Sequence, residues 1–111
     1  ELIAEATRLA LMAGADFVKT STGKTPVSAT PEAGAVILGE IAGSGFGAAG
    51  FKASGGIRTV ADAQPYLQLV ETKLGEAAVN PRRFRFGASG LLNDIEALLS
   101  GQAAVASTSS Y

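Results

Sequence analysis

Three short apolar segments, each followed by a loop rich in small residues and then by a helical pattern, recur at a nearly constant interval along the chain. They begin near Asp16, Ala49 and Arg83, an interval of about 33 residues, close to the roughly 31 residues that each unit takes in a (β/α)8 barrel of ~250 residues. The interval therefore predicts an α/β fold that contains the last three βα units of such a TIM barrel, preceded by the helix of an earlier unit.

The apolar spacing assigns helices and strands within this frame. Apolar residues recur with helical periodicity in four segments and form short runs in three others. We expect helices over residues 2–13, 30–42, 60–74 and 91–99, and strands over residues 16–19, 49–52 and 83–86. The chain is thus expected to contain one helix, followed three times by a strand and a helix.

Local signals mark where three of these helices begin or end. Gly14 is placed to end the first helix in the left-handed conformation that glycine adopts readily. Thr30, followed by Pro31, is typical of an N-cap at the start of the second helix. The segment Thr59–Asp62 is a capping arrangement for the third helix. Pro65 would cost that helix a hydrogen bond, so we expect the helix to start later or to kink.

Composition limits the classes of function that remain. The chain has 111 residues and a formal net charge of −1, and it contains neither cysteine nor histidine. The length suits one small domain, which we assign to residues 1–100, whereas the small polar residues 101–111 are expected to form a flexible tail. Disulfides, thiolate catalysis, a histidine base and the common zinc sites are excluded. No basic surface indicates a nucleic-acid partner.

The sequence also favours a cytoplasmic protein without a membrane partner. No apolar run approaches the ~20 residues needed to cross a bilayer, and Glu1–Glu5 lacks the basic start and apolar centre of a signal peptide. Three parallel strands alone would leave an exposed edge and an uncovered face. We therefore expect the chain to be the C-terminal part of a larger protein, and its open strand edges would favour a homo-oligomer.

Lysine residues lie at the ends of the first two expected strands. Lys19 follows the run Ala15–Val18, and Lys52 follows Ala49–Phe51. A lysine is unfavourable inside a buried strand because its ammonium needs a partner, whereas at the mouth of a strand it can act as a nucleophilic amine toward a carbonyl. A glycine-containing loop with another cation follows each lysine, a pattern that indicates a phosphorylated carbonyl substrate.

Three segments carry a resemblance to a known family. They are Ala15–Lys24 (ADFVKTSTGK), Gly50–Thr59 (GFKASGGIRT) and Phe84–Ser89 (FRFGAS), in the family's order and spacing. The ending Ser109–Tyr111 is similar to the tyrosine-terminated tail of some members. On these motifs the chain resembles the 2-deoxyribose-5-phosphate aldolases, which are class I aldolases that form a Schiff base on the (β/α)8 fold.

The resemblance implies a reaction and roles for three residues. Lys19 matches the lysine that forms the Schiff base, and Lys52 matches the second active-site lysine, whose charge favours a neutral amine beside it. Tyr111 matches a tail tyrosine that helps to move a proton at the enamine carbon. The implied reaction is the reversible cleavage of 2-deoxy-D-ribose 5-phosphate to D-glyceraldehyde 3-phosphate and acetaldehyde, with no metal or organic cofactor.

The resemblance also implies a phosphate site in the loops that follow the strands. Its expected residues are Gly23, Lys24, Gly55, Gly56, Arg58, Gly87 and Ser89. Two positions depart from the family's motifs, because Ser54 occurs where alanine is frequent and Gly90 where a second serine is frequent. The family's active-site aspartate comes from an earlier strand outside this chain, and neither Asp16 nor Asp62 matches it.

Simpler interpretations of these residues stay open. Lys19 can be a surface lysine at a strand end, and Lys24 and Arg58 can be solvated loop cations. Ser89 can cap the last helix, and Tyr111 can be just the end of the tail. Each of these interpretations needs no substrate.

Two rival functions belong to other classes. Gly23–Thr25 is similar to the end of a P-loop, but the glycine that a P-loop needs five residues before Gly23 is Val18 in this chain. An NTPase is therefore disfavoured. The second rival is a non-catalytic fragment that keeps the phosphate-binding loops without the aldolase cycle. Release of glyceraldehyde 3-phosphate would distinguish an enzyme from such a fragment.

Overall fold

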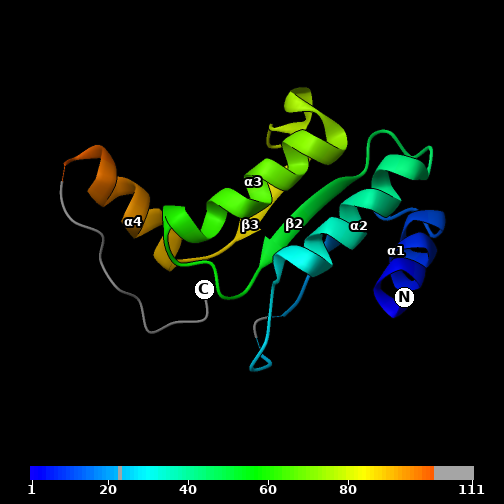
Figure 1. Ribbon diagram of the computed structural model, residues 1–111, viewed down its shortest axis with the longest axis horizontal. Helices are drawn as coiled ribbons and strands as arrows, with labels where there is room; N and C mark the ends of the chain where they lie inside the picture. The colour runs from blue at the N-terminus through cyan, green and yellow to red at the C-terminus, as the bar shows by residue number, and fades with distance from the viewer. Residues whose placement is uncertain (23, 102–111) are drawn as a thin grey trace.

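The computed structural model describes residues 1–22 and 24–101. Within them the helices are α1 (Leu2–Met12), α2 (Pro31–Gly43), α3 (Val60–Leu74) and α4 (Gly90–Leu99), and the strands are β1 (Phe17–Lys19), β2 (Gly50–Ser54) and β3 (Phe84–Gly87). A short 3₁₀ helix, η1 (Glu76–Ala78), which the sequence pattern did not predict, precedes β3. The expected order of one helix followed by three strand–helix units is confirmed (Figure 1).

The three strands form one parallel sheet in the order β1–β2–β3. Each strand is joined to the next through a helix, as parallel pairing requires. Figure 1 shows α1, α2 and α3 side by side, with α4 beyond α3. The described part of the chain is therefore an α/β structure, and the carboxyl ends of all three strands lie along one edge of the sheet.

The hydrophobic core lies between the sheet and the helices. Phe51 and Ala53 of β2 are fully buried there, and the ring of Phe51 stacks on that of Phe84 with 6.2 Å between centroids. The helices contribute the buried side chains of Ile37, Leu38, Ile41, Tyr66 and Val70. Because successive residues of a strand point to opposite faces, Lys52, between Phe51 and Ala53, lies on the face away from this core.

The end of α1 confirms the role expected for Gly14. Its φ is +94°, in the left-handed region. The Gly14 N–H donates to the carbonyl of Leu11, and the Ala15 N–H donates to the carbonyl of Ala10, both at 3.0 Å. These two bonds form a Schellman motif, which satisfies carbonyl groups at the end of the helix and turns the chain toward β1.

Both expected threonine caps are present. The hydroxyl of Thr30 accepts a hydrogen bond from the Ala33 N–H at 3.1 Å at the start of α2. At the start of α3, the hydroxyl of Thr59 accepts from the Asp62 N–H at 3.1 Å, while the Asp62 carboxylate accepts from the Thr59 N–H at 3.2 Å. This second pair is a complete capping box, so the sequence signal at residues 59–62 was read correctly.

Pro65 lies inside α3. The helix begins at Val60 and runs through Pro65, so the expectation of a later start is wrong, and the kink expected as the alternative stays a prediction. Pro65 has no N–H to donate to the carbonyl of Ala61. Both residues are exposed, so water can take the place of that donor. The capping box stabilises the helix start and offsets part of the cost of the lost bond.

Several element boundaries extend by one or two residues beyond the expected ones, among them the end of β2 and the start of α4. β2 continues to Ser54 because its last residues stay in register with β3, where Ser54 pairs with Gly87. α4 begins at Gly90, one residue before the expected start. None of the helices in the described ranges combines the length and the hydropathy that a membrane crossing requires.

Candidate active site

Lys19 of β1 and Lys52 of β2 are register partners in the parallel sheet. Neighbouring strands lie about 4.8 Å apart, and paired residues of a parallel sheet point to the same face. Lys19 is exposed and Lys52 is partly buried. The sheet therefore brings two amines that are distant in the sequence together on the face away from the core, near the carboxyl ends of the strands.

Arg85 of β3 is the next residue in this row, since it pairs with Lys52. Its guanidinium lies over the ring of Phe17, 4.3 Å from the centroid, and its Nε donates to the carbonyl of Pro81 at 2.8 Å. Phe17 begins β1 and Pro81 precedes β3, so both contacts lie toward the amino ends of the strands. Arg85 is therefore directed away from the edge at which the two lysines end.

Phe17 and Arg85 were not singled out from the sequence. The alternation of Phe84, Arg85 and Phe86 is a signal that would place Arg85 on the lysine face. The ring of Phe17 lies so close to Gly50 that a Cβ on Gly50 would be 2.5 Å from it. The contact between the Phe17 ring and Gly50 depends on how the strands pair, so the sequence motifs alone do not reveal it.

Hydroxyl groups join the ends of β1 and β2 beside the lysines. The hydroxyl of Thr20 accepts from the Ser54 N–H at 2.9 Å and lies 3.1 Å from the Ser54 carbonyl, to which it donates. The hydroxyl of Ser21 donates to the same carbonyl. The Thr20 N–H donates to the carbonyl of Lys52 at 3.1 Å. The relative position of Lys19 and Lys52 is thus set by hydrogen bonds as well as by packing.

The expected phosphate glycines after β2 (Gly55 and Gly56) and at the end of β3 (Gly87) each have a structural reason to be glycine. Gly55 and Gly56 have φ of +89° and +80°, in the left-handed region that side chains disfavour. A Cβ on Gly55 would overlap Ser28, and a Cβ on Gly87 would overlap Ser54. Gly55 is buried, Gly87 is partly exposed and Gly56 is exposed, so of these three glycines Gly56 has the backbone most accessible to an anion.

The N-terminus of α3 is occupied by two carboxylates. Asp94 Oδ2 accepts from the Val60 N–H at 2.8 Å. Asp62 Oδ2 accepts from the N–H groups of Arg58 at 3.1 Å and of Thr59 at 3.2 Å. The backbone N–H of Arg58, which belongs to the expected phosphate loop, thus already has an acceptor.

The N-terminus of α4 is different. Ser89 is at the N-cap position, but its side chain makes no capping hydrogen bond, so the interpretation of Ser89 as a simple helix cap lacks its defining contact. An uncapped first turn leaves backbone N–H groups that can receive an anion. Of the two helix starts that follow β2 and β3, the start of α4 is the more open to a phosphate.

The remaining expected residues are in the loop after β1 or outside the described ranges. Lys24 is exposed in the loop between β1 and α2, and its N–H donates to the Thr22 hydroxyl at 3.3 Å. Gly23 and Tyr111 lie outside the described residues, as does all of the expected tail except Gly101. Since α2 does not begin until Pro31, no helix directly follows residues 23–25, as a P-loop would require.

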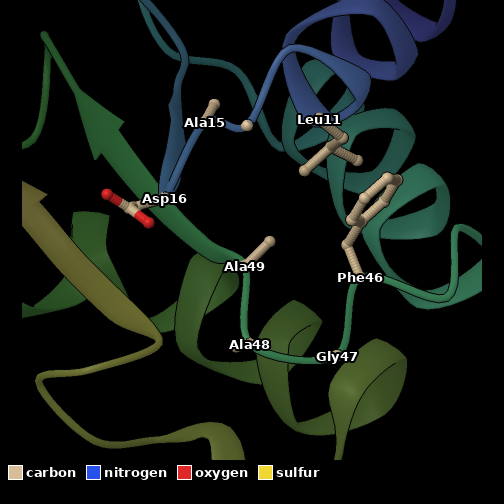
Figure 2. Close-up of a pocket in the computed structure, with 8 residues that line it drawn as sticks. Leu11, Ala15, Asp16, Phe46, Gly47, Ala48 and Ala49 are labelled. Atoms are coloured by element: carbon tan, nitrogen blue, oxygen red, sulfur yellow. The ribbon is translucent and has the colours of Figure 1, made fainter.

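A cavity of about 290 Å³ lies at the opposite end of the strands. Its walls are Leu11, Phe46 and the segments 14–16 and 47–49, which precede β1 and β2. Figure 2 shows Leu11 and Phe46 facing each other, while the carboxylate of Asp16 points away from them. The cavity is mainly apolar and has no part in the lysine site.

The fold and the site define a class of protein: a parallel α/β structure with two paired lysines at the carboxyl ends of neighbouring strands. The chain matches the family model described as DeoC/LacD family aldolase over residues 1–97. It therefore belongs to the DeoC/LacD aldolase family. The match includes all three strands and both lysines, and it supports an aldolase-type function.

Proposed function

We propose that this chain carries the Schiff-base site of a deoxyribose-phosphate aldolase, which reversibly cleaves 2-deoxy-D-ribose 5-phosphate to D-glyceraldehyde 3-phosphate and acetaldehyde. The observation that carries the proposal is the register pairing of Lys19 with Lys52 in a chain of the aldolase family. Lys19 is the nucleophile because it is the exposed member of the pair. Lys52 is the second lysine of the site, beside the nucleophile in the sheet.

The chemistry follows from an amine at this position. The neutral Nζ of Lys19 adds to the C1 aldehyde, and loss of water gives an iminium. The C3 hydroxyl gives up its proton to a base, the C2–C3 bond breaks, and its electron pair moves into the iminium to form an enamine. Glyceraldehyde 3-phosphate leaves. Protonation at C2, in which we propose a role for Tyr111, and hydrolysis then release acetaldehyde and restore the amine.

We propose that the substrate phosphate lies among the loops that follow the three strands, chiefly those after β2 and β3. The N-terminus of α4 supports this location because no side chain caps it, and a helix N-terminus attracts anions. The amides before α3 contribute less, since Asp62 and Asp94 already accept hydrogen bonds there. The proposed phosphate residues are Gly23, Lys24, Gly55, Gly56, Arg58, Gly87 and Ser89.

We further propose that the sheet forms three strands of a (β/α)8 barrel. The strands are parallel and in sequence order, and they begin at Phe17, Gly50 and Phe84, close to the expected interval. In such a barrel the helices lie outside and the opposite face of the sheet lies inside. The lysine face would then be the interior, with the lysines toward the carboxyl-terminal mouth.

Reductive trapping tests the function. The folded chain is treated with 2-deoxyribose 5-phosphate and borohydride, and the adduct is located by peptide mass mapping. We expect one reduced adduct on Lys19, none in Lys19→Arg, and an unchanged yield in Lys73→Arg, which alters an exposed lysine on α3. No adduct, or one spread evenly over Lys24, Lys52 and Lys73, would favour the alternative of a non-catalytic fragment that keeps only the phosphate-binding loops.

A further inference from the structure

The hydroxyl of Ser54, the last residue of β2, is buried without a partner. Ser54 is 0% exposed, and no described residue forms a hydrogen bond with its Oγ. Its backbone N–H and C=O are both bonded to Thr20, so the backbone is satisfied while the side chain is not. An unpaired buried hydroxyl is destabilising, and its presence in a folded protein calls for an explanation.

Lys52 borders the same space. Ser54 and Lys52 are two residues apart on β2 and therefore point to the same face. Gly87 of β3 is the register partner of Ser54. A Cβ on Gly87 would overlap Ser54 Oγ and would lie 3.2 Å from Lys52 Cε. The two side chains thus converge over Gly87, where the missing side chain leaves room for both.

The Lys52 ammonium also lacks a partner in this part of the chain. None of the hydrogen bonds or ion pairs among residues 1–22 and 24–101 involves it. An ammonium has three donors, and a hydroxyl has two acceptor lone pairs. The Lys52 ammonium therefore has no acceptor and the Ser54 hydroxyl has no donor among the described residues, and both side chains border the same small space.

We propose that Ser54 is a positioning residue for Lys52, whose ammonium donates a hydrogen bond to Ser54 Oγ over Gly87. Rotation about the terminal bonds of Lys52 moves the nitrogen around Cε, which already borders this space. The contact is charge-assisted and satisfies both groups. Because Gly87 belongs to β3, the contact holds the ammonium on the side of β2 away from β1.

The role of this contact in the reaction rests on the function proposed above. Lys19 on β1 and Arg85 on β3 are the charged residues that pair in register with Lys52, and Arg85 is directed toward Phe17. A Lys52 ammonium held toward β3 leaves the space beside Lys19 open for the substrate carbonyl. Ser54 acts on the reaction only through Lys52, since it is buried beneath the site.

The test is the exchange of lysine ammonium protons with water, measured by NMR on chain labelled with ¹⁵N-lysine. Lys52→Arg assigns the Lys52 signal. In the native chain we expect Lys52 to exchange more slowly than the exposed Lys73. In Ser54→Ala we expect the Lys52 ammonium protons to exchange faster, on the order of 10-fold, because one charge-assisted hydrogen bond is lost. Ser28→Ala, which removes another loop hydroxyl, should leave the rate unchanged.

The outcomes separate this proposal from the aldolase proposal. Equal exchange rates for Lys52 and Lys73 in the native chain, or an unchanged Lys52 rate in Ser54→Ala, would overturn the role of Ser54. Ser54→Ala should unfold at a lower temperature than the native chain, because it removes the acceptor of the Lys52 ammonium; an equal or higher unfolding temperature would also count against the contact. In the active enzyme its kcat should fall with KM unchanged. A native chain without activity would count against the aldolase function, while the exchange rates would still decide the Ser54 contact.

Discussion

Asp94 on α4 accepts a hydrogen bond at 2.8 Å from the backbone N–H of Val60, the first residue of α3. Asp94 is 1% exposed, and its other carboxylate oxygen has no partner among the described residues. The carboxylate thus caps a helix other than its own. It links α4 to α3 beside the loop that follows β2, so the position of that loop depends on a residue late in the chain.

We expect Asp94→Ala to lower the free energy of unfolding by about 1–2 kcal/mol, because the first turn of α3 loses an acceptor that its own capping box does not replace. Denaturant unfolding of the variant measures the loss. Glu96→Ala is the matched control, since Glu96 is an exposed acid on the same helix. Equal stability of the two variants would show that the Asp94 cap contributes nothing.

Gly87→Ala tests the close approach of β3 to β2. A Cβ at this position would overlap Ser54 Oγ and lie 3.0 Å from Ser54 Cβ. We expect a loss of about 1–3 kcal/mol, as for other overpacked sites. Gly47→Ala should cost far less, because Gly47 is exposed and has no atom within 4 Å of its Cβ position. Equal unfolding temperatures for the two variants would show that the contact between Gly87 and Ser54 is not tightly packed.

Two other glycines should respond in opposite directions to the same substitution. Neither Gly39 nor Gly14 has an atom within 4 Å of its Cβ position. Gly39 is exposed within α2, so Gly39→Ala should stabilise the protein by about 0.5–1 kcal/mol. Gly14 has a φ of +94°, so Gly14→Ala should destabilise it by about 1 kcal/mol. Thermal unfolding shifts of the same sign would contradict this assignment.

Tyr66 gives the protein a pH dependence in the alkaline range. Burial raises the pKa of Tyr66 above its ordinary value of 10.0, and the negative charges of Glu32 and Asp62 add to the effect. The folded state therefore holds the phenolic proton more tightly than the unfolded state does. This stabilisation is complete below the unfolded pKa of 10.0 and is lost as the pH rises through the higher folded pKa.

Phenolate absorbance measures this titration. In Tyr111→Phe, Tyr66 is the single remaining tyrosine of the two in the chain. We expect its absorbance to rise at higher pH in the folded protein than in denaturant, and the free energy of unfolding to decrease over the same interval. In the double variant Tyr66→Phe/Tyr111→Phe, the part of the decrease in the free energy of unfolding that Tyr66 causes should be absent. Titration of folded Tyr66 at or below the pH found in denaturant would refute the prediction.

The helices, the strands and their order could be predicted because their signals are local. The Gly14 turn and the Thr30 and Thr59 caps each depend on a few neighbouring residues, and all three are present. The start of α3 was less predictable. Pro65 is a strong local signal against an early helix, whereas one of the acceptors at that helix start comes from Asp94, on a different helix.

The candidate site was predictable only in part. The lysines at the strand ends were visible in the sequence, and strand pairing places them together. The direction of Arg85 was not predictable, because it depends on the ring of Phe17 lying across Gly50, a contact between three strands. The unpaired hydroxyl of Ser54 likewise results from its pairing with Gly87.

The hydrogen bonds between Thr20 and Ser54 have a consequence for motion at the site. They join β1 to β2 next to Lys19 and Lys52, at the point where strand ends usually separate first. When the sheet fluctuates, both strand ends must move together, because separating them would break paired backbone groups. The spacing of the two amines therefore depends on the hydroxyl of Thr20 as well as on the pairing of the strands.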